Sequence, residues 1–142
     1  MPNFCSFRII LNLPFMNDEM FGFEDLMLCK KIRSFKKGIC KIAKDFPRAE
    51  AFRLSDQMIR SVRSMNALIA EGYGRFTYPD QIHFCVQARG SLYETVSHLN
   101  DAYDEDYISD QLLSEKKKDA KEIEKMINGY LGFLRKKRDA EK

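Results

Sequence analysis

The chain has 142 residues, of which 32% are charged, and a formal net charge of +3. This length fits one ordinary domain with its own hydrophobic core, and the scarcity of Gly (7) and Pro (4) favours long helices over sheets. The small net charge does not by itself indicate nucleic-acid binding, so any such function depends on how the charges are distributed along the chain.

The first sixteen residues contain a short apolar run without a Lys-rich front or a small-residue cleavage site, which argues against a signal peptide. The run is also shorter than the roughly 20 apolar residues that span a bilayer. We expect translation to start at Met16 or Met20 and residues 1–21 to be a leader outside the domain. A chain that begins at Met16 should then be as stable as the full chain, whereas a leader docked on the core would be needed for stability.

Four cysteines occur without a C-x-x-C pair, and three of them lie among apolar residues of helix-like segments. The four cysteines are Cys5, Cys29, Cys40 and Cys85, and the last three are those in helix-like segments. This pattern is typical of small buried side chains in a reducing compartment and lacks the ligand pairs of a zinc site. We therefore expect a cytoplasmic protein without structural disulfides.

Apolar residues spaced three and four apart predict four amphipathic helices, over about residues 23–46, 48–76, 80–103 and from about 110 to the basic residues 135–138. The expected inward stripes are Cys29, Ile32, Phe35, Ile39, Ala43 and Phe46; Leu54, Met58, Met65, Ile69, Gly72 and Phe76; Ile82, Cys85, Ala88 or Arg89, Leu92, Val96 and Leu99; and Leu113, Ala120, Ile123, Ile127, Tyr130 and Leu134.

Proline and capping residues separate these helices. Pro47 ends the first helix and can open the second, Pro79 can be the first residue of the third, and Ser109 or Asp110 can cap the fourth. Helices joined by such short connections run antiparallel. The sequence therefore predicts an all-α fold, an antiparallel up-down four-helix bundle over residues 22–138, followed by a charged tail at 139–142.

Catalytic and metal-binding motifs are not recognisable in the sequence. The chain has only two histidines, His83 and His98, and lacks the paired Glu-x-x-His motifs of di-iron bundles. The stretch Gly72-Tyr73-Gly74 falls late in a predicted helix without a preceding strand, so it is not a phosphate-binding loop. We expect a protein that is not an enzyme and that holds no metal or cofactor.

A basic ridge stands out in the first predicted helix, with spacings of three and four that place its members on one exposed side. They are Lys30, Arg33, Lys37, Lys41 and Lys44, and Arg53, Arg60 and Arg63 extend the basic region into the second helix. Such a ridge can follow a phosphate backbone. The alternative is a solvated helix face that serves only solubility. Because no aromatic platform is evident beside the ridge, we expect weak RNA binding with little sequence preference.

Small residues form a second feature, because a glycine inside a helix costs ~1 kcal/mol relative to alanine and needs a structural reason. We expect Gly72 and Gly90 to mark a close crossing of the second and third helices, with Gly74 nearby. Glu71 and Arg75 are placed to form an ion pair four residues apart.

Three motifs resemble the 23S rRNA-intervening-sequence protein family, which consists of small bacterial four-helix bundle proteins. The motifs are Phe23-Glu24-Asp25-Leu26, Ile69-Ala70-Glu71-Gly72-Tyr73-Gly74-Arg75 and Gly90-Ser91-Leu92-Tyr93-Glu94. Their order and spacing cover about residues 22 to 136. The chain departs from the family pattern at Leu28-Cys29, where a tryptophan is common, and at Asn66-Ala67-Leu68, where Pro-Ser-Asn is common.

The resemblance implies a homo-oligomer, typically a pentameric ring, without an established enzyme activity. The fold is also similar to the accessory protein of diversity-generating retroelements, a pentamer that binds a reverse transcriptase and nucleic acid. We therefore expect an oligomeric module that binds RNA or a nucleic-acid-handling protein, with apolar or aromatic residues of the second and third helices near the subunit interface. The alternatives are a structural or protein-interaction bundle and, third, an enzyme.

Overall fold

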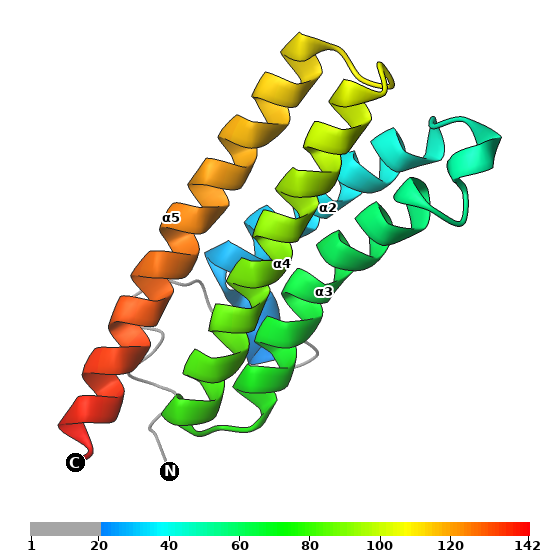
Figure 1. Ribbon diagram of the computed structural model, residues 1–142. Coiled ribbons are helices and arrows are strands. Elements are labelled where there is room, and N and C mark those ends of the chain that lie inside the picture. Colours follow the sequence, from blue (N-terminus) through cyan, green and yellow to red (C-terminus); the bar gives the residue numbers. More distant parts are fainter. Residues whose placement is uncertain (1–20) are drawn as a thin grey trace.

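The computed structural model describes residues 21–142 and forms four long helices joined by short connections (Figure 1). The helices are α2 (Met27–Lys44), α3 (Leu54–Gly74), α4 (Tyr78–Asp104) and α5 (Asp110–Ala140). Each helix packs against its neighbour in sequence, and α2 also packs against α5, which closes the bundle. The predicted all-α, up-down four-helix bundle is thus confirmed. The predicted leader at residues 1–21 and the predicted start at Met16 or Met20 lie, except for Phe21, outside the described residues.

The core is formed by the predicted inward stripes. All six members of the α2 stripe are buried, from Cys29 to Phe46. Residues such as Ile32, Met65 and Leu99 expose none of their surface, and each such side chain stabilises the fold by roughly 1.5–3 kcal/mol. One prediction is wrong: Phe76 is 49% exposed, because α3 ends at Gly74 and Phe76 takes a left-handed backbone conformation with φ of 62°.

The connection between α2 and α3 differs from the predicted helix over 48–76. A short 3-10 helix, η2 (Arg48–Glu50), and a turn precede α3, which begins only at Leu54. The Glu50 carboxylate (Oε2) accepts a hydrogen bond from the Leu54 backbone N–H at 3.2 Å, so Glu50 caps α3 from the end of η2. At the start of the described chain another 3-10 helix, η1 (Gly22–Asp25), replaces the predicted first turns of α2.

The remaining helix ends follow the capping residues. Thr77 caps α4 by accepting a hydrogen bond from the Asp80 N–H at 3.3 Å, with Pro79 in the first turn. Ser109 caps α5 by accepting one from the Leu112 N–H at 3.1 Å. Because α5 continues to Ala140, the first residues of the predicted tail at 139–142 belong to the helix.

Small side chains bring α3 and α4 close together, but Gly90 is not one of them. A Cβ added to Gly72 would lie 2.9 Å from the Cβ of Phe84 and 3.2 Å from the Cα of Gln81, both on α4. A Cβ added to Gly90 or Gly74 would meet nothing within 4 Å. The expected crossing of Gly72 with Gly90 is therefore wrong: Gly90 is exposed on the outer side of α4.

Serine and threonine hydroxyls extend the same contact toward the middle of the bundle. The Oγ of Ser61 and the Oγ1 of Thr95 lie 2.8 Å apart, and the Ser64 hydroxyl donates to the Ser91 Oγ at 2.7 Å. Short side chains with satisfied hydrogen bonds let the two helix backbones approach without leaving buried polar groups unpaired.

Candidate nucleic-acid interface

The five ridge residues on α2 all lie on the solvent side of the helix, opposite the buried stripe. They are Lys30, Arg33, Lys37, Lys41 and Lys44. At a rise of 1.5 Å per residue the ridge extends over about 20 Å. Among the residues that the structure describes, no ion pair involves Arg33, Lys37, Lys41 or Lys44. Most of the ridge charge therefore faces solvent without a carboxylate partner.

Lys31 shows how a neighbouring cation differs from the ridge. Its ammonium lies 2.8 Å from Glu122 Oε2 and 3.8 Å from Asp119 Oδ1, both on α5. The hydrogen bond with Glu122 raises the pKa of Lys31 and lowers the pKa of Glu122. Lys31 thus takes part in the packing of α2 on α5.

The three arginines that were expected to extend the basic region are exposed, but they do not share one helix. Arg53 lies in the connection before α3, whereas Arg60 and Arg63 lie on α3 itself. The Arg60 guanidinium (Nη1) is 3.6 Å from Asp56 Oδ2, an exposed pair that neutralises part of its charge. Arg60 also lines a groove between α3 and α4 together with Ser64 and Glu94, so the structure does not bring it to the α2 ridge.

A cleft beside the ridge adds a residue that sequence analysis missed. Its volume is about 440 Å³, and its lining residues come from η1, α2 and α3: Phe23, Glu24, Cys29, Lys30, Arg33, Lys36 and Asn66. Lys36 is the additional cation, and its position three residues after Arg33 could have revealed it. The Asn66 amide donates to the Cys29 carbonyl at 3.1 Å, while its Oδ1 is buried without a hydrogen-bond partner among the described residues.

The outer side of α4 has a different character. Val86 and Tyr93 are 38% and 57% exposed, and Gly90 between them carries no side chain. A groove of about 260 Å³ lies between α4 and α5, with Leu92, Val96 and Ala120 among its lining residues. At its edge the Tyr93 hydroxyl donates to Glu124 Oε1 at 2.5 Å, which raises the pKa of Tyr93 and lowers that of Glu124. Lys117 and Lys121 also line the groove, so this face combines an apolar surface with charged neighbours on α5.

Groups that could take part in catalysis have local structural partners. The Nε2 of His83 lies 2.7 Å from the Gln87 amide, and that of His98 lies 3.4 Å from Glu94 Oε1. Burial raises the pKa of both the Cys29 and Cys85 thiols to about 12.

Over residues 21–142 no group of three or more His, Cys, Asp or Glu side chains is arranged to hold a metal ion. No helix in this range is both long and apolar enough to cross a membrane.

The sequence model of the 23S rRNA-intervening sequence protein matches residues 24–129, which is most of the chain. The chain belongs to this family. A crystal structure of a protein of unknown function from the S23 ribosomal protein family of Bacteroides thetaiotaomicron has a similar fold, with a TM-score of 0.68 and 24% identity. The match covers 74% of this chain and 98% of that one. No curated protein matches the sequence.

Proposed function

We propose that this family member is a non-catalytic, homo-oligomeric cytoplasmic protein that binds RNA through the α2 ridge. The observation that carries the proposal is the ridge itself: five cations follow one another on the solvent side of α2, and four of them have no carboxylate partner in the described part of the chain. Side chains that serve bundle packing, such as Lys31, are paired instead.

Phosphate contacts of this kind act through charge. Each Lys or Arg that neutralises a phosphate releases condensed counterions, so the affinity falls as the salt concentration rises. For single strands, the logarithm of the binding constant falls by roughly 0.7 per phosphate contact for each tenfold rise in salt concentration. Such contacts carry no sequence information. We therefore expect RNA binding that depends strongly on salt and weakly on sequence.

The oligomeric part of the proposal is supported by the outer side of α4. Val86, Gly90 and Tyr93 follow one another on this helix as a row without charge, and such a surface is favourable against another copy. The family resemblance implies five subunits. A ring would repeat the ridge in every subunit, so a modest affinity per ridge would increase through avidity.

Two observations support the absence of catalysis. The raised pKa of Cys29 and Cys85 keeps both thiols protonated near neutral pH, and a protonated buried thiol is a poor nucleophile. Each histidine ring also contacts a residue four positions away on its own helix, His83 with Gln87 and His98 with Glu94. These contacts do not connect either imidazole to a residue of another helix.

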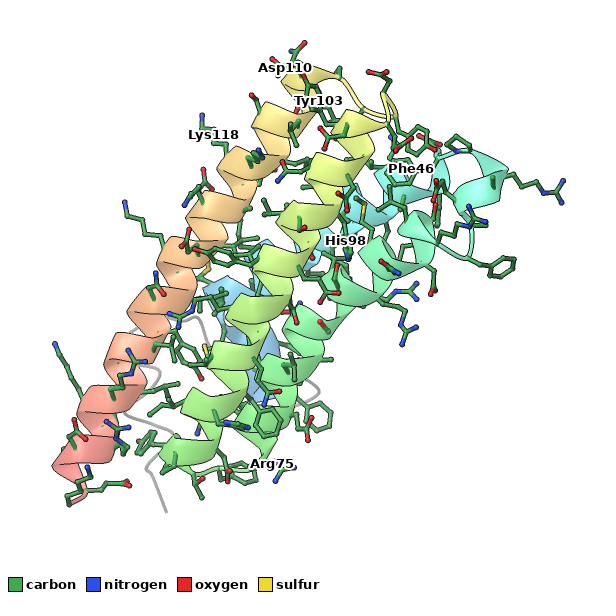
Figure 2. The ribbon with its side chains drawn as sticks, viewed as in Figure 1. Phe46, Arg75, His98, Tyr103, Asp110 and Lys118 are labelled. Atoms are coloured by element: carbon green, nitrogen blue, oxygen red, sulfur yellow. The ribbon has the colours of Figure 1, made fainter. Side chains whose placement is uncertain are left out.

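The test compares two double variants with the same change in net charge. Lys37→Glu with Lys41→Glu reverses the centre of the ridge, and Lys118→Glu with Lys125→Glu reverses two exposed positions on the outer side of α5, where Lys118 points away from the bundle (Figure 2). Affinity for a structured RNA is measured at about 50 mM and about 200 mM salt.

We expect the ridge variant to bind at least tenfold more weakly at low salt and with a shallower salt dependence, while the α5 variant stays close to wild type. Equal losses in the two variants would mean that net charge alone governs binding. Unchanged affinity in the ridge variant, or binding that ignores salt, would remove the ridge from the mechanism and favour the alternative of a protein-interaction bundle supported by the α4 surface.

A further inference from the structure

The connection between α2 and α3 presents an aromatic ring to solvent. Phe52 is 94% exposed, and the connection projects from the bundle at the upper right of Figure 1. The neighbouring Phe46 instead packs into the core, with its ring centroid 5.4 Å from that of Tyr107 (Figure 2). Single exposed apolar residues are common on protein surfaces, so the exposure of Phe52 is informative only together with its surroundings.

Those surroundings carry both signs of charge, with cations in slight excess. Arg48 and Arg53 are exposed on either side of Phe52 in sequence, and Lys44, the last residue of the ridge, precedes them. Two acids accompany them: Asp45 is exposed, and Glu50 has both carboxylate oxygens engaged, Oε1 by the Tyr107 hydroxyl at 3.1 Å and Oε2 by the Leu54 N–H. Residues 44–53 thus hold three cations and two acids, so cations of the ridge end and of the connection lie near the exposed aromatic ring, with a net charge of +1.

A cleft of about 360 Å³ lies at the same corner. Lys44 and Arg48 contribute its cationic lining, and Ala43, Phe46, Pro47 and Ile59 are among its apolar lining residues. An apolar cleft with cations at its border suits a flat, weakly polar group attached to a phosphate. An unpaired nucleotide has this chemistry, because its base is planar and its backbone is anionic.

We propose that Phe52 is a stacking platform for an unpaired base of an RNA whose backbone follows the α2 ridge, with the adjacent cleft receiving a neighbouring base. This inference rests on the proposed function and adds the preferred substrate, which is a single-stranded segment or loop. Every base has a π-face, so stacking on Phe52 is tolerant of sequence. A duplex offers no free base face, so Phe52 contributes little to duplex binding.

The chain contains no tryptophan, so Phe52→Trp provides a single fluorescent reporter at the proposed platform. Tyr103→Trp is the matched control: Tyr103 is 39% exposed at the end of α4, near the acidic residues Asp104 and Glu105. The probes are a single-stranded RNA oligonucleotide and an RNA duplex of the same length, and fluorescence anisotropy of the labelled RNA reports total binding in the same samples.

We expect the single strand to quench the tryptophan emission of the Phe52→Trp protein strongly and that of the Tyr103→Trp protein weakly, and we expect the duplex to quench neither. In parallel, Phe52→Ala and Phe52→Leu should each lower the affinity for the single strand about tenfold and leave duplex affinity unchanged. Binding by anisotropy without quenching, or wild-type affinity in the Phe52→Leu protein, would overturn the platform and leave the ridge proposal intact. If no RNA bound to any of these proteins, the proposed function itself would be overturned.

Discussion

The outer sides of α2 and α4 differ far more than their inner sides do. Inside, both helices present apolar residues and a buried cysteine to one core, Cys29 on α2 and Cys85 on α4. Outside, α2 carries five exposed cations, whereas α4 carries the uncharged row Val86, Gly90 and Tyr93, with the exposed acids Glu94 and Asp101 beside it. Because packing in the core determines only the residues on the inner side of each helix, the composition of the outer sides is determined by contacts with solvent or with other molecules. A row of cations is complementary to phosphates, and an uncharged, partly apolar face is complementary to protein.

The largest expected effect comes from placing charge on the α4 face. Val86→Lys with Tyr93→Lys should convert the oligomer to monomers, because two buried and unpaired cations at a subunit interface are strongly unfavourable. The measurement is the solution mass by light scattering. Gln111→Lys with Ser114→Lys adds the same number of lysines at exposed positions near the start of α5 and should keep the mass of the wild type. A wild-type protein that is monomeric at micromolar concentration would contradict the oligomer.

A second prediction separates the functions of the two faces. The monomeric α4 variant retains every ridge residue, yet it should bind RNA about 10- to 100-fold more weakly because the avidity of repeated ridges is lost. The Lys37→Glu and Lys41→Glu variant should lose RNA binding and keep the oligomeric mass. Binding measured by anisotropy and mass measured on the same preparations provide the comparison. If the monomer bound RNA as tightly as the wild type, the ridges would act singly.

The same contrast explains how much the sequence could predict. All six residues of the first expected stripe are buried, because only one side of α2 is apolar and helical periodicity then indicates which residues face the core. The stripe left out Leu28 and Ile42, which are buried as well. On α4 apolar residues occur on both sides, so two members of the expected stripe, Ile82 and Val96, are only half-buried. Exposure of the ridge followed from periodicity alone.

Other features depended on where helices end and on contacts between elements. Phe52 lies off the expected inward stripe, but its place in a projecting connection was missed, because the predicted helix over 48–76 contained no turn before Leu54. The cleft with Lys36 and Asn66 requires three elements to meet, which no local pattern encodes. Gly90 was misplaced for a related reason: a helical glycine indicates that a side chain is missing but does not indicate on which side.

A third prediction concerns the inner sides, which should behave alike. Burial raises the pKa of Cys29 and Cys85 from 9.0 to about 12, so both thiols stay protonated in the folded protein at pH values where the unfolded chain ionises them. The stability contribution is therefore complete below pH 9 and is lost as the pH rises toward 12, which predicts melting temperatures that fall above pH 9. Cys85→Ala should make that fall shallower.

Alkylation of the native protein provides a site-resolved check of the same burial. At pH 8 a maleimide should modify the half-buried Cys40 more rapidly than Cys29 or Cys85, as located by peptide mass spectrometry. Rapid modification of Cys29 or Cys85 without unfolding would show that the core around α2 and α4 opens readily.

The smallest expected effects come from two glycines that distinguish the inner and outer sides of the α3–α4 hairpin. Gly72→Ala should lower the free energy of unfolding by about 1–3 kcal/mol, because the new Cβ would lie 2.9 Å from the Phe84 Cβ and 3.2 Å from the backbone of Gln81, which cannot move independently. A Cβ added to Gly90 would have no neighbour within 4 Å in the subunit. Gly90→Ala should therefore raise the free energy of unfolding by up to about 1 kcal/mol, because alanine has the higher helix propensity. Denaturant unfolding of both variants in the Val86→Lys, Tyr93→Lys background measures these effects without subunit contacts. The same substitution is also made in the wild-type oligomer. If Gly90→Ala no longer raises the stability there, or lowers it, Gly90 lies against another copy. If Gly90→Ala raises the stability equally in both backgrounds, Gly90 lies outside the interface.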